Sequence, residues 1–285
     1  MAIKDIFLPL ASYPTPTTVA AIEKGVAIAG YLGADISATA VELEVPAPAS
    51  PFTRAFVPGG GAPVEEAPEH QKSLLNSRQM LEAFEVAAKS SKVGHTRTIA
   101  PCSAEDMAAL LVSRSRLSDL SLIAVKDYDG GQEKMIESLL FESGRPLLLF
   151  SEKSVDKLSN SFDHVAIAWD HSAQASRAVG DALPLLQSAK VVHILTAAEK
   201  STPSLLESGN ALVGHLAKHG VEASFKILKI DGSSVGKVFE AYVKANSIDL
   251  LVMGAYRHSR LREFVMGGAT YTVLGHPPCW VLMAH

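Results

Sequence analysis

The sequence predicts an α/β protein made of two doubly wound, mostly parallel five-stranded sheet domains in tandem. Short apolar segments alternate with segments whose apolar residues recur at the 3.6-residue period of a helix, as in a sheet covered on both faces. The order of these segments in the first half returns in the second half. The chain has 285 residues, of which 47% are hydrophobic, enough for about two domains with their own cores.

The first half begins with an apolar strand over residues 6–10 and a helix over 18–32. The helix is predicted because Val19, Ile22 and Val26 share one face and Gly33 stops it. A second strand over 35–43 leads into residues 46–68, whose Pro, Ala and Gly content predicts a loop. The remaining elements are a helix over 69–90, a strand over 96–99, a helix opening at Ser103 with acids in its first turn, and strands over 120–125 and 146–150.

The second half repeats this order. Its predicted elements are strand 165–169, helix 172–187, strand 191–195, helix 204–218, strand 223–230, helix 235–245, and strands 250–253 and 280–283. In this register Ala11 corresponds to Asp170 and Asp119 to Asp249, with offsets of 159 and 130 residues, and the 46–68 segment accounts for the difference. The chain is therefore interpreted as an internal duplication with domains over 1–153 and 160–285.

Composition excludes several classes of protein. The net charge is −4 and no lysine or arginine cluster stands out, so no basic field is available for a nucleic acid. No uncharged apolar stretch reaches the roughly 18 residues of a membrane span, and the N-terminus lacks the pattern of a signal peptide. Cys102 and Cys279 are too few for a disulfide framework. These features predict a cytoplasmic protein with reduced thiols, no membrane contact and no nucleic-acid partner.

The segment that bears most on function lies near the C-terminus. An apolar run, Leu250–Met253, ends at Gly254, and a basic stretch later reaches Gly267-Gly268-Ala269-Thr270. A parallel strand that ends at glycine and returns through glycine into a helix presents backbone N–H groups and the helix dipole to an anion. The segment therefore predicts a phosphate site. Its basic residues, among them Arg257 and His258, either bind such an anion or form a solvated loop.

These residues carry a resemblance to a known family. Residues 166–172, Ala-Ile-Ala-Trp-Asp-His-Ser, resemble the opening strand and aspartate turn of the universal stress protein family, and residues 249–282 resemble its closing segment. The chain is similar to a tandem protein of this family. The resemblance covers the second half throughout and rests, in the first half, on topology and on weaker matches at 119–125 and 139–150. It implies two Rossmann-like domains of the adenine-nucleotide α-hydrolase type.

Members of this family that bind ATP carry glycine, two residues, glycine, nine residues, then glycine followed by serine or threonine. Gly254 and Gly267 match the first and last glycines, but Arg257 replaces the middle glycine and Gly268 replaces the hydroxyl residue. Glycine lets a phosphate come close to the backbone because it has no side chain, and the Cβ of Arg257 would keep the phosphate further away. The guanidinium of Arg257 can instead supply positive charge to the phosphate. Thr270 lies near enough in sequence to substitute for the lost hydroxyl.

The resemblance implies a ligand and a set of site residues. The ligand would be ATP or AMP, bound by the second domain only, with no metal beyond magnesium that accompanies the nucleotide. Asp170 matches the family's adenine contact, and Ile194, placed at the end of the second strand, matches a residue lining the base pocket. The full set is Ala168, Asp170, Ile194, Met253, Gly254, Arg257, His258, Gly267, Gly268, Ala269 and Thr270.

The first half departs from this pattern. Ala11 stands where the second half has Asp170, and the loop equivalent, residues 126–131, carries Asp127 and Asp129 where phosphates would sit. Because these carboxylates repel a phosphate, we expect the first half to bind no nucleotide by the family mode. Its expected role is structural, as the partner that packs against the second half.

Three further groups of residues have competing interpretations. Cys102 precedes a helix, where the dipole can lower a thiol pKa, yet a small residue at a strand end is the favoured reading. His215 and His219 have the i,i+4 spacing of metal ligands, but Leu216 stands where a zinc protease has glutamate, which favours solvated histidines. Asp170, His171 and Ser172 are the residue types of a hydrolase triad, but neighbours in one turn point apart, so a triad is rejected.

Three functions remain open from the sequence. The first is a non-enzymatic stress-response or regulatory protein whose second domain binds ATP or AMP. The second is a universal stress protein that binds no nucleotide and acts by dimerisation and protein contacts. The third is a slow ATP hydrolase of the adenine-nucleotide α-hydrolase group, against which stands the lack of a catalytic base, nucleophile or metal-ligand set in the loop. A homodimer is favoured over a monomer, and the protein partner is not identified.

Overall fold

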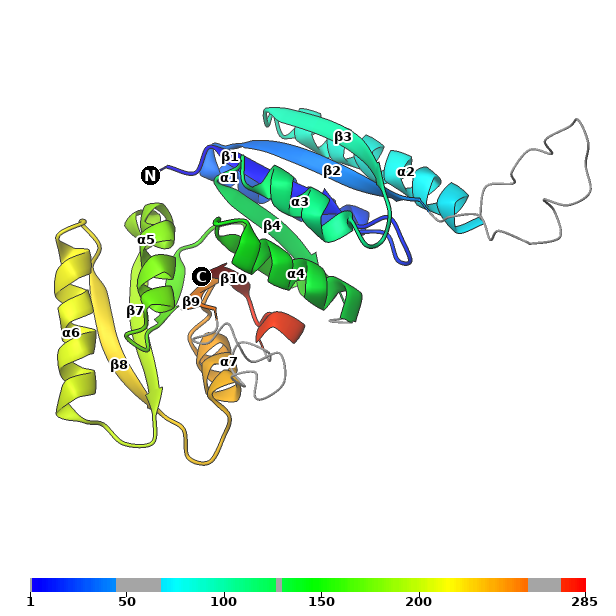
Figure 1. The fold of residues 1–285 in the computed structure, drawn as a ribbon. Coiled ribbons are helices and arrows are strands. Elements are labelled where there is room, and N and C mark those ends of the chain that lie inside the picture. The colour runs from blue at the N-terminus through cyan, green and yellow to red at the C-terminus, as the bar shows by residue number, and fades with distance from the viewer. Residues whose placement is uncertain (1, 45–67, 127–129, 256–272) are drawn as a thin grey trace, which may run out of the picture.

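The computed structural model describes residues 2–44, 68–126, 130–255 and 273–285 (Figure 1). The elements of the first half are β1 (Asp5–Leu10), α1 (Val19–Leu32), β2 (Asp35–Leu43), α2 (Pro68–Ser90), β3 (His95–Cys102), α3 (Met107–Ser115), β4 (Leu120–Val125), α4 (Gly130–Glu142), β5 (Leu147–Ser151) and the 3-10 helix η1 (Glu152–Lys157). Those of the second half are β6 (His164–Ala168), α5 (Ala173–Ser188), β7 (Val191–Ala198), α6 (Pro203–Ala217), β8 (Ala223–Lys229), α7 (Val235–Ala245), β9 (Leu250–Gly254) and β10 (Trp280–Ala284).

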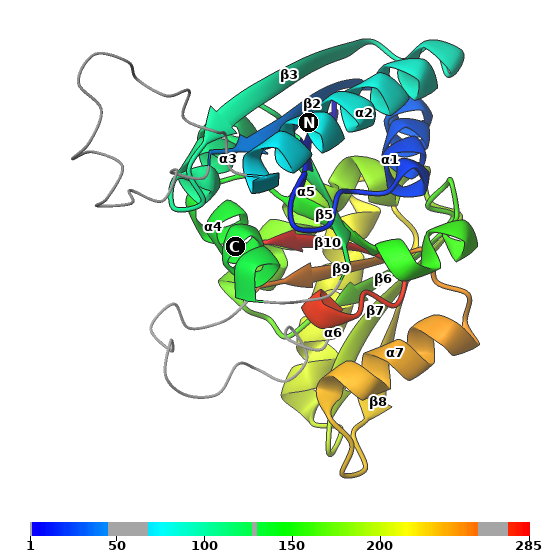
Figure 2. The same ribbon diagram turned by 90° about the vertical axis from the view of Figure 1, so that its right-hand side faces the viewer.

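The strands form one continuous sheet in the order β3-β2-β1-β4-β5-β10-β9-β6-β7-β8. Each half contributes five parallel strands, and the order β3-β2-β1-β4-β5 of the first half is matched by β8-β7-β6-β9-β10 of the second. The halves meet where β5 and β10 pair antiparallel, with Leu149 opposite Val281 (Figure 2). The predicted fold class is confirmed, and its two five-stranded units are joined edge to edge.

One hydrogen-bond pattern occurs at the start of the sheet in both halves. In the first half the Asp119 carboxylate accepts from the backbone N–H of Asp5 at 3.1 Å, and the N–H of Asp119 donates to the carbonyl of Asp5 at 2.9 Å. In the second half Asp249 forms the same two bonds with His164, at 2.9 and 2.8 Å. These paired contacts support the predicted correspondence of Asp119 with Asp249.

Helices cover both faces of the sheet and create two apolar cores. One face packs against α1, α2, α5 and α6, with Ile22, Phe84, Val179 and Leu212 among the buried side chains. The other face packs against α3, α4 and α7 through residues such as Leu111, Ile136 and Phe239. Because strands with both faces covered need apolar residues on both, β4, β9 and β10 are almost wholly buried, as their continuous apolar sequence predicts.

An aromatic cluster lies at the junction of the halves. The Trp280 ring is fully buried, 4.7 Å from the ring centroid of Phe150 and 6.0 Å from that of Phe162. Phe162 in turn meets Tyr31 edge to face at 5.6 Å. The Trp280 indole N–H donates to the carbonyl of Ser159 at 2.9 Å, so the segment between η1 and β6 is built into the same core. Side chains of both halves therefore share one packed interior.

Most predicted elements agree with the structure, but several boundaries differ, and α4 was not predicted. The helix predicted to open at Ser103 begins at Met107, because the Ser103 hydroxyl instead closes a turn, accepting from the Asp106 N–H at 3.2 Å and donating to its carboxylate. The third predicted strand is longer than expected and spans His95–Cys102. The predicted 46–68 loop lies outside the described residues except for Pro68. Within the described ranges, no helix is long and apolar enough to cross a membrane.

Candidate functional site

A sheet of this topology has one natural ligand position in each half. Ligands of doubly wound folds bind beyond the carboxyl ends of the strands, where the strand order reverses. In the second half this switch point lies between β6 and β9, and in the first half between β1 and β4. The loops that follow these strands therefore decide what each half can bind.

In the second half the loop after β6 is arranged around the start of α5. The backbone N–H of Ser172 donates to the Asp170 carboxylate at 3.0 Å, and the Ser172 hydroxyl accepts from the N–H of Ala175 at 3.1 Å as the helix N-cap. Asp170 is exposed and therefore available to a ligand. These contacts explain Asp170 and Ser172 as turn and cap residues, in agreement with the rejection of a triad.

His171, between these two residues, has an unusual backbone conformation. Its φ of 63° lies in the left-handed region, which residues other than glycine rarely adopt. Its imidazole is exposed, and its ring centroid lies 5.8 Å from that of Trp169. The turn therefore holds the Asp170 carboxylate at the surface through a locally costly conformation.

Gly254 lies against the first turn of α5. A Cβ built on Gly254 would come within 2.4 Å of the backbone nitrogen of Ala175 and 2.5 Å of the carbonyl carbon of Gln174. Such distances are shorter than any real contact, so only glycine fits the end of β9 at this point. The structure thus brings Gly254 against the start of α5, the helix that follows the Asp170 turn, and gives Gly254 a packing role that needs no ligand.

The other predicted site residues in the described ranges lie deeper. Ala168 ends β6 and is the register partner of Met253 in β9, so both flank the switch point. The placement of Ile194 at a strand end was wrong, because β7 continues to Ala198. Ile194 is fully buried in the middle of that strand. The residue that meets the end of β6 is Thr196, whose hydroxyl donates to the carbonyl of Trp169 at 2.7 Å.

The remaining predicted site residues lie outside the described part of the chain. They are Arg257, His258, Gly267, Gly268, Ala269 and Thr270. The structure therefore describes the strand ends and the Asp170 turn of the predicted site.

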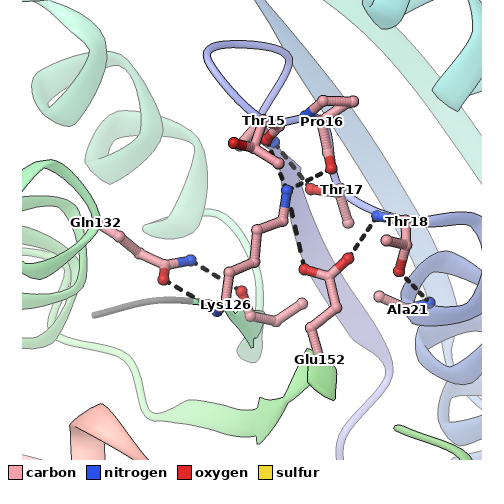
Figure 3. A network of polar contacts seen from close by, with 10 residues as sticks. Thr15, Pro16, Thr17, Thr18, Ala21, Lys126, Gln132 and Glu152 are labelled. Carbon is pink, nitrogen blue, oxygen red and sulfur yellow. Dashed lines mark hydrogen bonds and ion pairs between the residues drawn. The ribbon is translucent and has the colours of Figure 1, made fainter. Parts of the chain in front are cut away.

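In the first half the corresponding position holds a network of the chain's own charged side chains (Figure 3). Lys126, directly after β4, points its ammonium at the β1–α1 loop, where it donates to the carbonyl oxygens of Thr15, at 2.6 Å, and Pro16. Its nitrogen lies 3.9 Å from the Oε2 of Glu152, the first residue after β5. The Oε1 of Glu152 accepts from the backbone N–H of Thr18, the N-cap of α1, at 2.5 Å.

The carboxylate of Glu152 was not found from the sequence. Counted along the strands, Ala11 stands where the second half has Asp170, and counted back from the helix caps, Pro16 does; neither is an acid. In the structure the N–H of the N-cap residue Thr18 donates instead to Glu152, which lies 134 residues later in the chain. The only sequence signal is an acid directly after an apolar strand, which is too common to indicate such a contact.

Both charged groups of this network are shielded from water. The side chains of Lys126 and Glu152 retain 17% and 6% of their exposure. Burial lowers the pKa of the Lys126 ammonium, and the nearby Glu152 carboxylate opposes that shift. Neighbouring groups hold the Lys126 backbone in place, since its N–H donates to Gln132 at 3.1 Å and the Gln132 amide donates to the carbonyl of Ala124 at 2.9 Å.

The other candidate residues have plain structural roles. Burial raises the pKa of the Cys102 thiol, with smaller contributions from Asp106 and Glu44, which supports its reading as a strand-end residue. Cys279 is buried and its pKa is also raised by burial. The rings of His215 and His219 are exposed and lie 4.9 Å apart. Among the described residues, no three His, Cys, Asp or Glu side chains gather into a metal site.

Comparison with known proteins agrees with the fold and the second-half sequence. Residues 161–285 match the model of the universal stress protein family. The whole fold is similar to a universal stress protein from Archaeoglobus fulgidus DSM 4304, with 13% identity, 98% of this chain and 97% of that one covered, and a TM-score of 0.67. It is also similar to a putative universal stress protein from Pseudomonas aeruginosa UCBPP-PA14, with 14% identity, coverage of 99% and 93%, and a TM-score of 0.57. No curated protein matches the sequence.

Proposed function

We propose that the chain is a regulatory stress-response protein of the universal stress protein kind, whose second half, residues 161–285, matches that family's model and binds ATP or AMP. The observation that carries the proposal is the exposed Asp170 carboxylate, held by the N–H of Ser172 in the turn before α5, whose first turn packs against Gly254. A carboxylate at this position can accept hydrogen bonds from an adenine amino group or a ribose hydroxyl. The hydrogen bonds of the turn to Ser172 and the N-cap of α5 favour a preformed site.

The proposal is tested by isothermal titration of the full chain with ATP and AMP. Asp170→Ala should weaken binding at least about tenfold, because hydrogen bonds to charged groups contribute about 1.5–3 kcal/mol. The matched control is Asp181→Ala, which removes an acid from α5 that pairs with Arg177 at 2.8 Å. No heat and no thermal shift at millimolar nucleotide would eliminate nucleotide binding.

A second experiment addresses the departures from the family's glycine pattern. The double variant Arg257→Gly with Gly268→Ser restores that pattern and should tighten ATP binding. An unchanged affinity would show that the mapping of residues 254–268 onto the family's glycine pattern is wrong. The role is proposed as non-enzymatic, so ATP hydrolysis should stay at background, and turnover that disappears in Asp170→Ala would contradict this.

One observation favours the alternative in which the protein binds no nucleotide and acts through dimerisation and protein contacts. Gly254 is required by its packing against Gln174 and Ala175, so this glycine alone does not indicate a phosphate. A homodimer would have to use a surface other than the β5 and β10 edges, which are paired within the chain. Native mass spectrometry of the purified protein measures co-purified nucleotide and assembly size together. The cytoplasmic location stays a prediction.

A further inference from the structure

We propose that the first half carries an internal ligand: the Glu152 carboxylate occupies an anion site at the start of α1, and the Lys126 ammonium serves as its counter-cation. The proposal does not depend on whether the second half binds nucleotide. It concerns the three segments drawn in Figure 3, which follow β1, β4 and β5 and meet at the switch point of the first half.

The start of α1 has the properties of an anion site. The helix has no acid in its first turn, so no residue there complements the positive end of the helix dipole. The N–H of its N-cap residue, Thr18, points at Glu152 Oε1 at 2.5 Å. In the second half the N–H of the equivalent residue, Ser172, donates to Asp170 at 3.0 Å. The anion at this position is therefore local in one half and supplied from a distant segment in the other.

The burial of Glu152 separates this arrangement from an ordinary helix cap. The residue is 8% exposed, and its Oε2 accepts no hydrogen bond from any described residue. A cap needs one oxygen, and leaving the other buried without a hydrogen bond is costly. The nearest compensating charge is the Lys126 ammonium at 3.9 Å, whose own bonds go to the carbonyls of Thr15 and Pro16.

The geometry matches a bound anion and its cation more closely than a simple ion pair. The carboxylate accepts a hydrogen bond at a helix N-terminus, as a bound anion would. The ammonium donates to two backbone carbonyls, which are the kind of ligand that a bound cation would have. Because both groups are tethered, they hold the β1–α1 loop to the ends of β4 and β5 at all times. The first half would then remain in one state regardless of small anions in solution.

The test is chemical rescue of the full chain. Glu152→Ala should lower the Tm by roughly 5–10 °C, as expected when a buried pair loses one partner, and should leave a hole the size of a small carboxylate. Sodium formate should then stabilise the variant. At about ten times its dissociation constant, formate should raise the ratio of folded to unfolded chain about tenfold, whereas sodium chloride at equal ionic strength should not.

The matched control is Glu142→Ala, which removes an exposed acid from the end of α4. It should show no difference between formate and chloride. An equal response of Glu152→Ala and Glu142→Ala to formate would overturn the proposal, because the start of α1 would then not bind an anion.

A second variant keeps the proposal testable if Glu152→Ala does not fold. Lys126→Ala removes the cation instead and leaves Glu152 and the carbonyls of Thr15 and Pro16 without it. It should be stabilised by ammonium chloride over tetramethylammonium chloride, which is too large for the site, and sodium formate should give no gain over sodium chloride. The reverse selectivity, or none, would show that the pair does not stand in for a ligand and its counter-ion.

Discussion

At the scale of single residues, Gly254 has both a structural and a functional interpretation. The family pattern assigns it to a phosphate loop, while the structure shows it in close contact with the backbone of Gln174 and Ala175. Gly180, in the middle of α5, has open space around its Cβ position and an ordinary helical conformation. Gly180 therefore serves as the control for a substitution at Gly254.

Gly254→Ala should destabilise the protein by about 1–3 kcal/mol, because the added methyl overlaps backbone atoms that can move only with α5. Gly180→Ala should stabilise it by about 0.5–1 kcal/mol, because alanine is the better helix former. Urea denaturation measures both changes. Equal effects of the two substitutions would contradict the close packing of β9 on α5.

The two cysteines should react slowly in the folded protein. Burial raises both thiol pKa values, which reduces the thiolate fraction at neutral pH. At pH 7.5, Cys279 should resist a thiol reagent until the chain is unfolded, and Cys102 should react more slowly than free cysteine. Counting modified thiols by mass spectrometry checks this, with both modified in guanidinium as the control. Rapid modification of Cys102 would restore the reading as a reactive cysteine.

The sequence predicted individual site residues only where they are local to a motif. Asp170 was predicted from its match to the family's aspartate turn; the structure places it exposed between β6 and α5, and its contact with a ligand stays a prediction. Ile194 was misplaced because the β-branched and small residues after it continue the strand to Ala198, and no turn residue marks an earlier end. Glu152 was missed because its partners come from the loops after β1 and β4, and such contacts depend on tertiary structure.

At the scale of elements, periodicity predicted most strands and helices closely. The bounds of β2, β4 and α7 match the prediction, and their starts are marked by Asp35, Asp119 and Ser234. The start of α3 was wrong because a serine followed by acids can close a turn as well as cap a helix. Local sequence therefore predicts that an element occurs better than it predicts both of its ends.

Helix α5 contains Pro184 in its interior, which makes a further test possible. Proline lacks the N–H that would donate to the carbonyl four residues earlier, at Gly180. Pro184→Ala should therefore stabilise the protein by about 1–3 kcal/mol. The matched control is Pro203→Ala at the first position of α6, where no intrahelical bond is lost, and its effect should stay within about 0.5 kcal/mol. Thermal unfolding compares them, and a destabilised Pro184→Ala protein would contradict the expectation.

At the scale of the whole molecule, the β5–β10 pairing and the Trp280 cluster join both halves into one sheet and one interior. The duplication was predicted from the repeated order of strands and helices. The pairing of β5 with β10, which joins the two sheets, was not predicted. Both strands are apolar throughout, so their sequences carry no local signal for which edge strand each one pairs with. Such a shared core should unfold cooperatively.

Trp280→Ala should destabilise the whole chain by about 3–5 kcal/mol, because it removes a large buried ring and a hydrogen bond to Ser159. The chain has two tryptophans, so fluorescence of this variant reports Trp169 in the second half, while circular dichroism reports both halves. The two signals should change at the same urea concentration. Separate transitions would show independent halves. The control is Leu206→Ala, at a side chain that is 45% exposed on α6.

Joining the halves covalently has a consequence for how they can diverge. In a symmetric homodimer every substitution appears in both subunits, so a change that closes one site closes the other. Here Glu152 and Asp170 belong to one polypeptide but to different halves, and each can mutate without altering its counterpart. A fused pair can thus specialise, with one member kept as a scaffold while the other retains its chemistry.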